Sequence, residues 1–176
     1  MVPLSTELAG DLMWMQTGAI SRYHELRAGD SVFAQLEFRK AFGSLASGKT
    51  GQGAWTFKRR GFLHATVGVR KADSNEDLMV YEPNWSGRRG QIHTATGVTY
   101  NWEAANFWGT EWVLSKPRGP KLAYFRNKGV VRSAAEVTLS DEAYADPELV
   151  LLLMLCWYLI LLYMMDAAAA STAAIG

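Results

Sequence analysis

Residues 149–165 read LVLLLMLCWYLILLYMM and contain no charged side chain and no amide. At about 1.5 Å per residue this segment predicts a helix of roughly 25 Å, the lower limit for spanning a bilayer and also the thickness of a small domain. A helix that is apolar on every face has to be enclosed, because packing on one side alone would leave a large exposed patch. The surroundings of this segment therefore decide the fold.

The residues in front of the apolar segment predict where its helix begins. Asp146 is suited to the N-cap position, Pro147 to the first helical position, and Glu148 to the first turn, near the positive end of the helix dipole. We expect the helix to cover about 147–166. The alanines that follow would allow it to run further.

The chain before the helix has the period-two pattern of half-buried antiparallel strands, interrupted by turn residues. Two runs are the clearest, and they place Val32, Ala34, Leu36 and Phe38, then Leu63, Ala65, Val67 and Val69, on core faces. Ten further strands are expected at 12–16, 21–26, 42–46, 54–58, 78–82, 91–94, 98–102, 111–115, 122–126 and 130–138.

Three environments can enclose the apolar helix: a bilayer, a groove on a partner protein, or the chain's own sheet. The first two would make the protein tail-anchored or part of a complex. The third fits the strand number, since about twelve strands close around a lumen that requires a filler. The charges nearest the segment are Asp146, Glu148 and Asp166, whereas membrane spans are usually flanked by Lys or Arg. We therefore predict a mainly β fold, a closed antiparallel barrel of about twelve strands around one central C-terminal helix.

Length and composition predict one domain of intracellular type. The 176 residues suit one hydrophobic core. We expect residues 1–170 to form it and 171–176 to be a frayed tail. The N-terminal stretch lacks the basic and apolar regions of a secretory signal, which favours a cytoplasmic location. Cys156 is the only cysteine, so an internal disulfide is excluded and a buried, inert thiol is expected.

The predicted organisation resembles the superfamily that includes the tubby C-terminal domain, the plant LURP-one-related proteins and the phospholipid scramblases. The residues that carry the resemblance are the apolar helix and the strand and turn series before it, including 97–102, 112–114 and 122–125. The resemblance implies a barrel of about twelve strands around a hydrophobic helix. It also implies contact with lipid or phosphoinositide, as in some relatives, or a scaffold role, as in others. No functional residue is transferred from the family.

The segment Gly43-Ser44-Leu45-Ala46-Ser47-Gly48-Lys49-Thr50 matches the phosphate-loop pattern G-x-x-x-x-G-K-[ST]. That chemistry requires a strand before the loop and a helix after it, so that backbone N–H groups converge on phosphate. The residues after Thr50 are glycine-rich and then strand-like. A hairpin connection is the favoured interpretation, and a nucleotide-binding enzyme using Lys49 and Thr50 is kept as an alternative.

Other catalytic and metal patterns are weak, and we predict a non-catalytic protein without a cofactor. His24, His64 and His93 are isolated in the sequence, so no metal site is expected. The chain has no G-x-S-x-G nucleophile turn. The acidic residues between 136 and 148 are explained by helix capping rather than by paired-carboxylate catalysis.

Basic residues concentrate in the middle of the chain, where 49–132 holds 14 of the 18 Lys and Arg. Many lie at predicted turns, where they could gather on one rim and attract anionic lipid headgroups. Trp85 and Trp108, the latter after Phe107, lie in turns that could reach a membrane interface. The candidate anion-binding residues are Lys58, Arg59, Arg60, Arg88, Arg89, Lys116, Arg118 and Lys121.

The leading hypothesis is thus a non-catalytic cytoplasmic barrel, peripheral to a membrane, that binds an anionic phospholipid surface or a protein partner. A solvated surface without a ligand is the plainer interpretation of the same charges. Nucleic acid is disfavoured, because the pI near 7.9 is low for a dedicated binder and no recognition motif is present.

Overall fold

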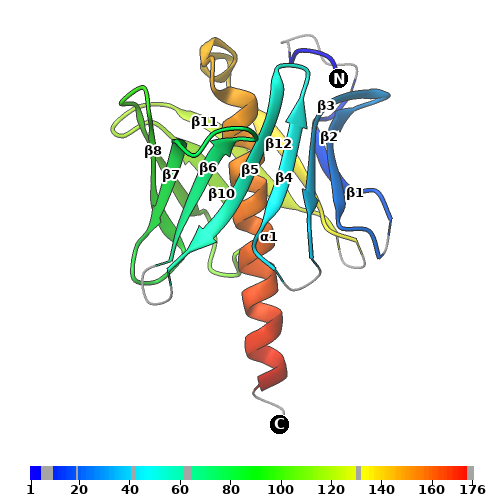
Figure 1. Ribbon diagram of the computed structural model, residues 1–176, viewed down its shortest axis with the longest axis vertical. Helices are drawn as coiled ribbons and strands as arrows, with labels where there is room; N and C mark the ends of the chain where they lie inside the picture. The colour runs from blue at the N-terminus through cyan, green and yellow to red at the C-terminus, as the bar shows by residue number, and fades with distance from the viewer. Residues whose placement is uncertain (5–9, 19, 41–42, 62–64, 130–131, 174–176) are drawn as a thin grey trace.

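Twelve antiparallel strands form a closed barrel around one helix, α1, in the computed structural model (Figure 1). The structure describes residues 1–4, 10–18, 20–40, 43–61, 65–129 and 132–173. Each strand pairs with its sequence neighbours, and β1 pairs with β12 to close the cylinder. The strands are β1 (Met13–Gln16), β2 (Tyr23–Ala28), β3 (Ser31–Phe38), β4 (Ala46–Thr50), β5 (Gly53–Arg60), β6 (Thr66–Lys71), β7 (Asp77–Pro83), β8 (Arg89–Thr94), β9 (Thr99–Ala104), β10 (Glu111–Ser115), β11 (Lys121–Asn127) and β12 (Ala134–Leu139). A short 3-10 helix, η1 (Asp141–Ala145), leads into α1 (Leu149–Ala173). The predicted fold class is confirmed.

The strands place alternate side chains inside the barrel, as the period-two pattern predicts. In β2, for example, His24, Leu26 and Ala28 are buried while the residues between them are only half-buried. The predicted positions Leu63 and His64, and the start of the strand expected from Val130, lie outside the described residues.

The strand expected at 42–46 is the one clear misplacement among the described residues. The strand in this region, β4, begins at Ala46 and continues through Gly48 to Thr50, while Phe42 lies outside the described residues. The small residues of β4 have weak strand propensity, so the position of this strand is set by tertiary packing and not by local preference. A side chain at position 48 would collide with Met154 of α1 and with Phe57 of β5. The glycine lets the sheet wall approach the central helix closely.

The central helix is enclosed by the barrel over the first half of its length. Every residue from 152 to 162 is at most 8% exposed. Trp157 packs between Trp14, whose ring centroid is 5.9 Å away, and His24, at 5.8 Å. By length and hydropathy α1 resembles a membrane span, a test that core helices of soluble proteins also meet, and 67% of its most apolar window is buried here. The apolar segment therefore serves as the barrel's core.

Both ends of α1 differ slightly from the sequence prediction. At its start, α1 begins at Leu149 instead of at the predicted residue 147. The Asp146 carboxylate nevertheless accepts a hydrogen bond of 3.0 Å from the backbone N–H of Glu148, as predicted for a capping residue. At its end, the helix continues to Ala173 instead of stopping near Asp166, so the frayed tail expected from Ser171 is wrong for 171–173. Alanine has the highest helix propensity, which explains the extension. Residues 166–173 are exposed and project beyond the strands (Figure 1).

Candidate functional site

The barrel has two chemically different ends, which we name by the course of α1. Because all strands are antiparallel and pair in sequence order, successive connections alternate between the two ends. The helix-start end, where α1 begins, carries the connections 29–30, 51–52, 72–76, 95–98, 116–120 and 140–148. The helix-exit end, where α1 projects, carries 17–22, 39–45, 61–65, 84–88, 105–110 and 128–133.

Exposed apolar side chains gather at the helix-exit end. Four large apolar residues are more than three-quarters exposed: Ile20 at 97%, Trp85 at 94%, Phe107 at 78% and Trp108 at 77%. All four lie in helix-exit connections. At the helix-start end, the exposed large apolar residues among those described are Met1 at 48%, Val2 at 46% and Val98 at 38%. The four most exposed apolar side chains among the described residues thus share one end, which is typical of an interaction surface.

Charge is divided between the same two ends. The helix-exit connections contain six basic residues and no acidic one: Arg22, Arg39, Lys40, Arg88, Lys128 and Arg132. The helix-start connections contain seven acidic and two basic residues: Asp30, Asp73, Glu76, Asp141, Glu142, Asp146 and Glu148, with Lys116 and Arg118. The acidic distribution complements the helix dipole, which is positive where α1 starts.

The predicted anion-binding residues do not all share one rim. Arg59, Arg60, Arg88 and Arg89 lie at the helix-exit end, with Lys58 one residue further up β5, and Trp85 and Trp108 lie beside them. Lys116, Arg118 and Lys121 belong to the β10–β11 connection, at the helix-start end. The expectation that these turns gather on one rim is therefore corrected. In an antiparallel barrel, consecutive turns face opposite ways however close they are in sequence.

Arg88 links the two aromatic loops of the helix-exit end. Its guanidinium donates hydrogen bonds of 2.6 Å to the backbone carbonyls of Asn106 and Phe107, and it stacks 5.5 Å from the centroid of the Phe107 ring. Phe107 in turn meets Trp108 edge to face at 5.4 Å. The loop that carries Trp85 and the loop that carries Phe107 and Trp108 are thus held together by Arg88.

Arg59 and Arg60, also at this end, are engaged in ion pairs. Arg60 and Arg70 hold the Asp77 carboxylate at 2.8 and 2.7 Å. Burial by itself would raise the pKa of Asp77, but the hydrogen bonds from both arginines keep that pKa below its ordinary value. Arg59 donates to Asp166 of α1 at 2.6 Å. The hydrogen bond to Asp166 outweighs burial and raises the pKa of Arg59.

A cleft opens beside α1 at the helix-exit end, and we name it the exit cleft. Its volume is about 530 Å³, and its walls include Arg59, Trp85, Trp102, Trp112, Tyr163 and Asp166. Trp102 and Trp112 stack with centroids 5.4 Å apart, and Trp112 meets Tyr163 edge to face at 5.1 Å. The floor is aromatic, and the Arg59–Asp166 pair stands at its edge.

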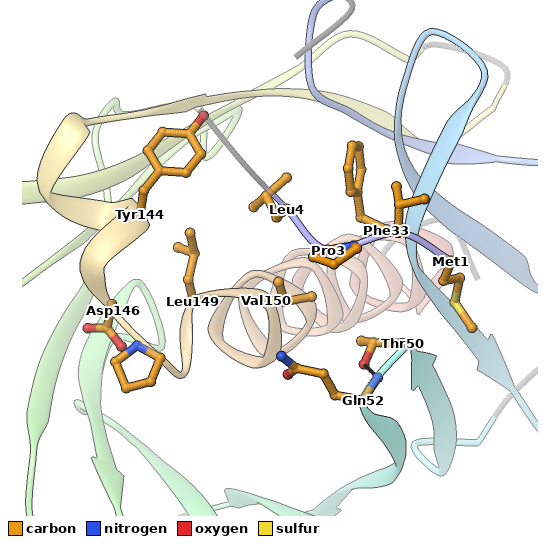
Figure 2. A pocket seen from close by; sticks show the side chains of 13 residues that line it. Met1, Pro3, Leu4, Phe33, Thr50, Gln52, Tyr144, Asp146, Leu149 and Val150 are labelled. Carbon is orange, nitrogen blue, oxygen red and sulfur yellow. Dashed lines mark hydrogen bonds between the residues drawn. The ribbon is translucent and has the colours of Figure 1, made fainter. Parts of the chain in front are cut away.

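A smaller cavity of about 300 Å³ lies at the helix-start end, over the first turn of α1 (Figure 2). Figure 2 shows Pro3 and Leu4 lying across it, between Phe33 and Tyr144. The segment that crosses it is held by a hydrogen bond of 3.1 Å from the N–H of Val2 to the carbonyl of Val32 in β3. This end is partly covered by the chain's own N-terminal segment.

The polar groups beside that cavity serve helix capping. The Asp146 carboxylate accepts a hydrogen bond of 2.7 Å from the Tyr100 hydroxyl, and the Lys116 ammonium lies 3.7 Å from it. Burial, together with the Asp146 charge, raises the pKa of the Tyr100 hydroxyl. Burial and the same carboxylate raise the pKa of Glu148. Asp146 is thus committed to the start of α1.

Metal-binding and nucleophilic chemistry find little support in the described residues. No group of three or more His, Cys, Asp or Glu side chains that could hold a metal ion occurs among them. His24 is 4% exposed, and burial lowers its pKa to about 4. His93 lies 3.2 Å from the Thr99 hydroxyl on the neighbouring strand, and His64 is outside the described residues. Cys156 is fully buried, which raises its pKa, so its thiol is shielded as predicted.

The phosphate-loop pattern does not adopt phosphate-loop geometry. Gly48, Lys49 and Thr50 belong to β4, and the chain turns directly into β5, which pairs antiparallel with β4. A strand after the pattern leaves no helix N-terminus to face a phosphate. Most of the segment is therefore strand β4, and the hairpin connection follows it at residues 51–52.

Sequence reasoning found Trp85 and the Phe107-Trp108 pair, but it missed four contributors to this end. Ile20, Arg22, Arg39 and Lys40 come from the first two helix-exit connections, outside the basic middle of the chain. A lone isoleucine in a turn was the only available signal for Ile20.

Comparison with known proteins does not identify a family: no family model matches the chain, and no curated protein or solved structure matches it either.

Proposed function

We propose that the protein is a non-catalytic domain that binds the anionic surface of a membrane through its helix-exit end. The observation that carries this proposal is the coincidence, at one end, of four highly exposed apolar side chains and six basic loop residues without an acidic one. Aromatic side chains favour the headgroup layer, and basic residues near a charged bilayer contribute about 1 kcal/mol each. An anionic cytoplasmic leaflet suits both groups.

The projecting part of α1 fits the same orientation. Residues 167–173 carry no charge and extend about 10 Å along the helix axis. The hydroxyls of Ser171 and Thr172 donate to the carbonyls of Ala167 and Ala168 at 2.9 and 3.0 Å. Hydroxyls that bond to their own helix are less costly to move into an apolar layer. With the helix-exit end on a bilayer, this segment would enter the interface while the barrel stays in water.

Vesicle flotation tests the proposal. Full-length protein is mixed with vesicles of phosphatidylcholine alone and with the same vesicles containing phosphatidylserine. We expect binding to the anionic vesicles only. The pair Arg39→Gln and Lys40→Gln should weaken it by about 2 kcal/mol, or roughly thirtyfold.

A matched pair of substitutions at the other end provides the control. Arg118→Gln and Lys121→Gln remove the same charge from the helix-start end and should change the affinity less than about twofold. Equal binding to both vesicle types, or equal weakening by both pairs, would contradict the proposal. A full-length chain that stays monodisperse only in detergent would favour the tail-anchored alternative.

A further inference from the structure

The exit cleft has the size and position of a ligand site. Its volume of about 530 Å³ lies within the range of small-molecule pockets. It is bounded by α1 on one side and by the β7–β8 loop with Trp85 on the other. Because it opens at the end that we propose to face a bilayer, a lipid could enter it without crossing water.

The interior of the exit cleft suits a hydrocarbon chain. Trp102, Trp112 and Tyr163 form a contiguous aromatic cluster at its base, and Leu159 and Leu162 of α1 adjoin it. Trp102 and Trp112 are at most 2% exposed, so the accessible apolar walls of the cleft are Trp85 and Tyr163. The indole N–H of Trp112 is already bonded to the Gly109 carbonyl at 2.9 Å. With that donor satisfied, this part of the floor offers ring faces and methyl groups rather than open hydrogen-bonding positions.

The edge of the exit cleft suits an anion. Arg59 is only one-third exposed, and its planar guanidinium can hold a carboxylate or a phosphate through two parallel hydrogen bonds. Its present partner is the carboxylate of Asp166, which belongs to the same chain and is 57% exposed. An anionic headgroup would take the place of Asp166 on Arg59, while Asp166 would turn to solvent.

We infer that the exit cleft binds one acyl chain of an anionic membrane lipid, with the headgroup on Arg59 and with Asp166 as a competing internal anion. This inference rests on the proposed function, because it names the lipid contact that the helix-exit end would make. The acyl chain lies between Trp85 and Tyr163, over the buried pair Trp102 and Trp112. Arg59 selects for negative charge, and the Arg59–Asp166 pair closes the edge when no lipid is bound.

Calorimetric titration with soluble single-chain lipids tests this site apart from membrane binding. The probes are oleoyl lysophosphatidic acid and oleoyl lysophosphatidylcholine, both below their micelle concentrations. They share the same acyl chain, and the first is anionic whereas the second carries a neutralising choline group. We expect the anionic lipid to bind more tightly. Arg59→Gln should weaken it by about tenfold, the loss of one charge-assisted hydrogen bond. Asp166→Asn should strengthen it severalfold, because the competing charge is gone.

Two further variants separate the cleft from the surface. Ala65→Trp places a bulky side chain at the cleft wall and should abolish binding of both probes. Arg89→Gln, at the same end but not lining the cleft, should leave probe affinity unchanged and weaken only vesicle flotation. Asp166 is exposed, so its variant is expected to fold even where Ala65→Trp does not.

The outcomes distinguish this inference from the proposed function. Absence of probe binding, or equal affinity of the parent, Arg59→Gln and Asp166→Asn, would overturn the lipid site. If anionic vesicles still float the protein in that case, the surface proposal stands by itself. Probe binding without flotation would support the site and remove the membrane surface as its source of lipid.

Discussion

The two ends of the barrel differ in the charge of their loops and in the apolar side chains that they expose. At the helix-start end, acidic residues neutralise the positive end of α1, Asp146 caps it, and the segment 1–4 lies over the opening. At the helix-exit end, the loops are basic, four apolar side chains remain in solvent, and α1 projects past the strands. Folding explains the first arrangement completely. The exposed aromatic groups of the second have no role in the fold, which is why we assign function to that end.

The largest expected effect is on stability, and it tests whether the enclosed helix α1 is the core of the barrel. The difference between the two ends exists only if α1 runs through the barrel from one end to the other. Trp157→Ala removes a ring that is fully buried between Trp14 and His24, and should lower the free energy of unfolding by about 3–5 kcal/mol. Trp108→Ala, at an exposed site of the helix-exit end, is the matched control and should cost less than about 0.5 kcal/mol. Chemical denaturation measures both. Similar losses in the two variants would break the comparison.

The next effect concerns pH and the interior near the helix-exit end. His24 has a native pKa of about 4 because it is buried, whereas an unfolded histidine titrates near 6.5. Between these values the unfolded chain binds more protons, so stability rises with pH across that window. The stabilisation that depends on neutral His24 is fully present above pH 6.5. As the pH drops toward 4, the free energy of unfolding falls by up to about 3 kcal/mol.

Denaturation midpoints measured from pH 4 to pH 7 check this prediction. His24→Phe should flatten the dependence, because no proton-binding group remains at the site. His93→Phe, at a partly exposed position on the barrel wall, is the control and should keep the slope of the parent. A parent chain with a flat profile would show that His24 is reached by solvent.

A smaller effect on stability is expected at the helix-start end, where Asp146 has a structural role. Asp146→Ala removes the cap of α1 and the acceptor for the Tyr100 hydroxyl, and should cost about 2 kcal/mol of stability. Vesicle binding should not change. Thermal denaturation and flotation of the same preparation test both statements. A loss of flotation without a loss of stability would transfer function to this end.

The smallest effect sharpens the role of the aromatic residues at the helix-exit end. Trp85→Ala should weaken binding to anionic vesicles by about 1 kcal/mol, roughly fivefold, through lost insertion at the interface. Because Trp85 is 94% exposed, the unfolding midpoint should stay the same. Val98→Ala, in a helix-start connection, should alter neither property. Equal flotation of the two variants would argue against insertion of the aromatic loop.

The sequence supported the fold better than the site. Strand positions followed from alternation, and the exception was β4, where Gly48 is selected by contact with Phe57 on the next strand and with Met154, more than a hundred residues later. Trp85 and Trp108 stood out because large aromatic residues in polar turns are unusual. Ile20 and Arg39 did not, because nothing local marks a turn as belonging to the helix-exit end.

By itself, the sequence determined that an apolar helix starting after Asp146 must be enclosed and that about twelve short strands precede it. Hydrophobicity and the alternation of apolar and polar residues are local properties of a chain, so they can be read from the sequence. Only the tertiary structure decided which turns meet. Antiparallel pairing in sequence order sends Arg88 and Trp85 to one end and Lys116 and Arg118 to the other. The exit cleft arises in the same way, because closure of the barrel brings Arg59 of β5 to Asp166 of α1, more than a hundred residues later.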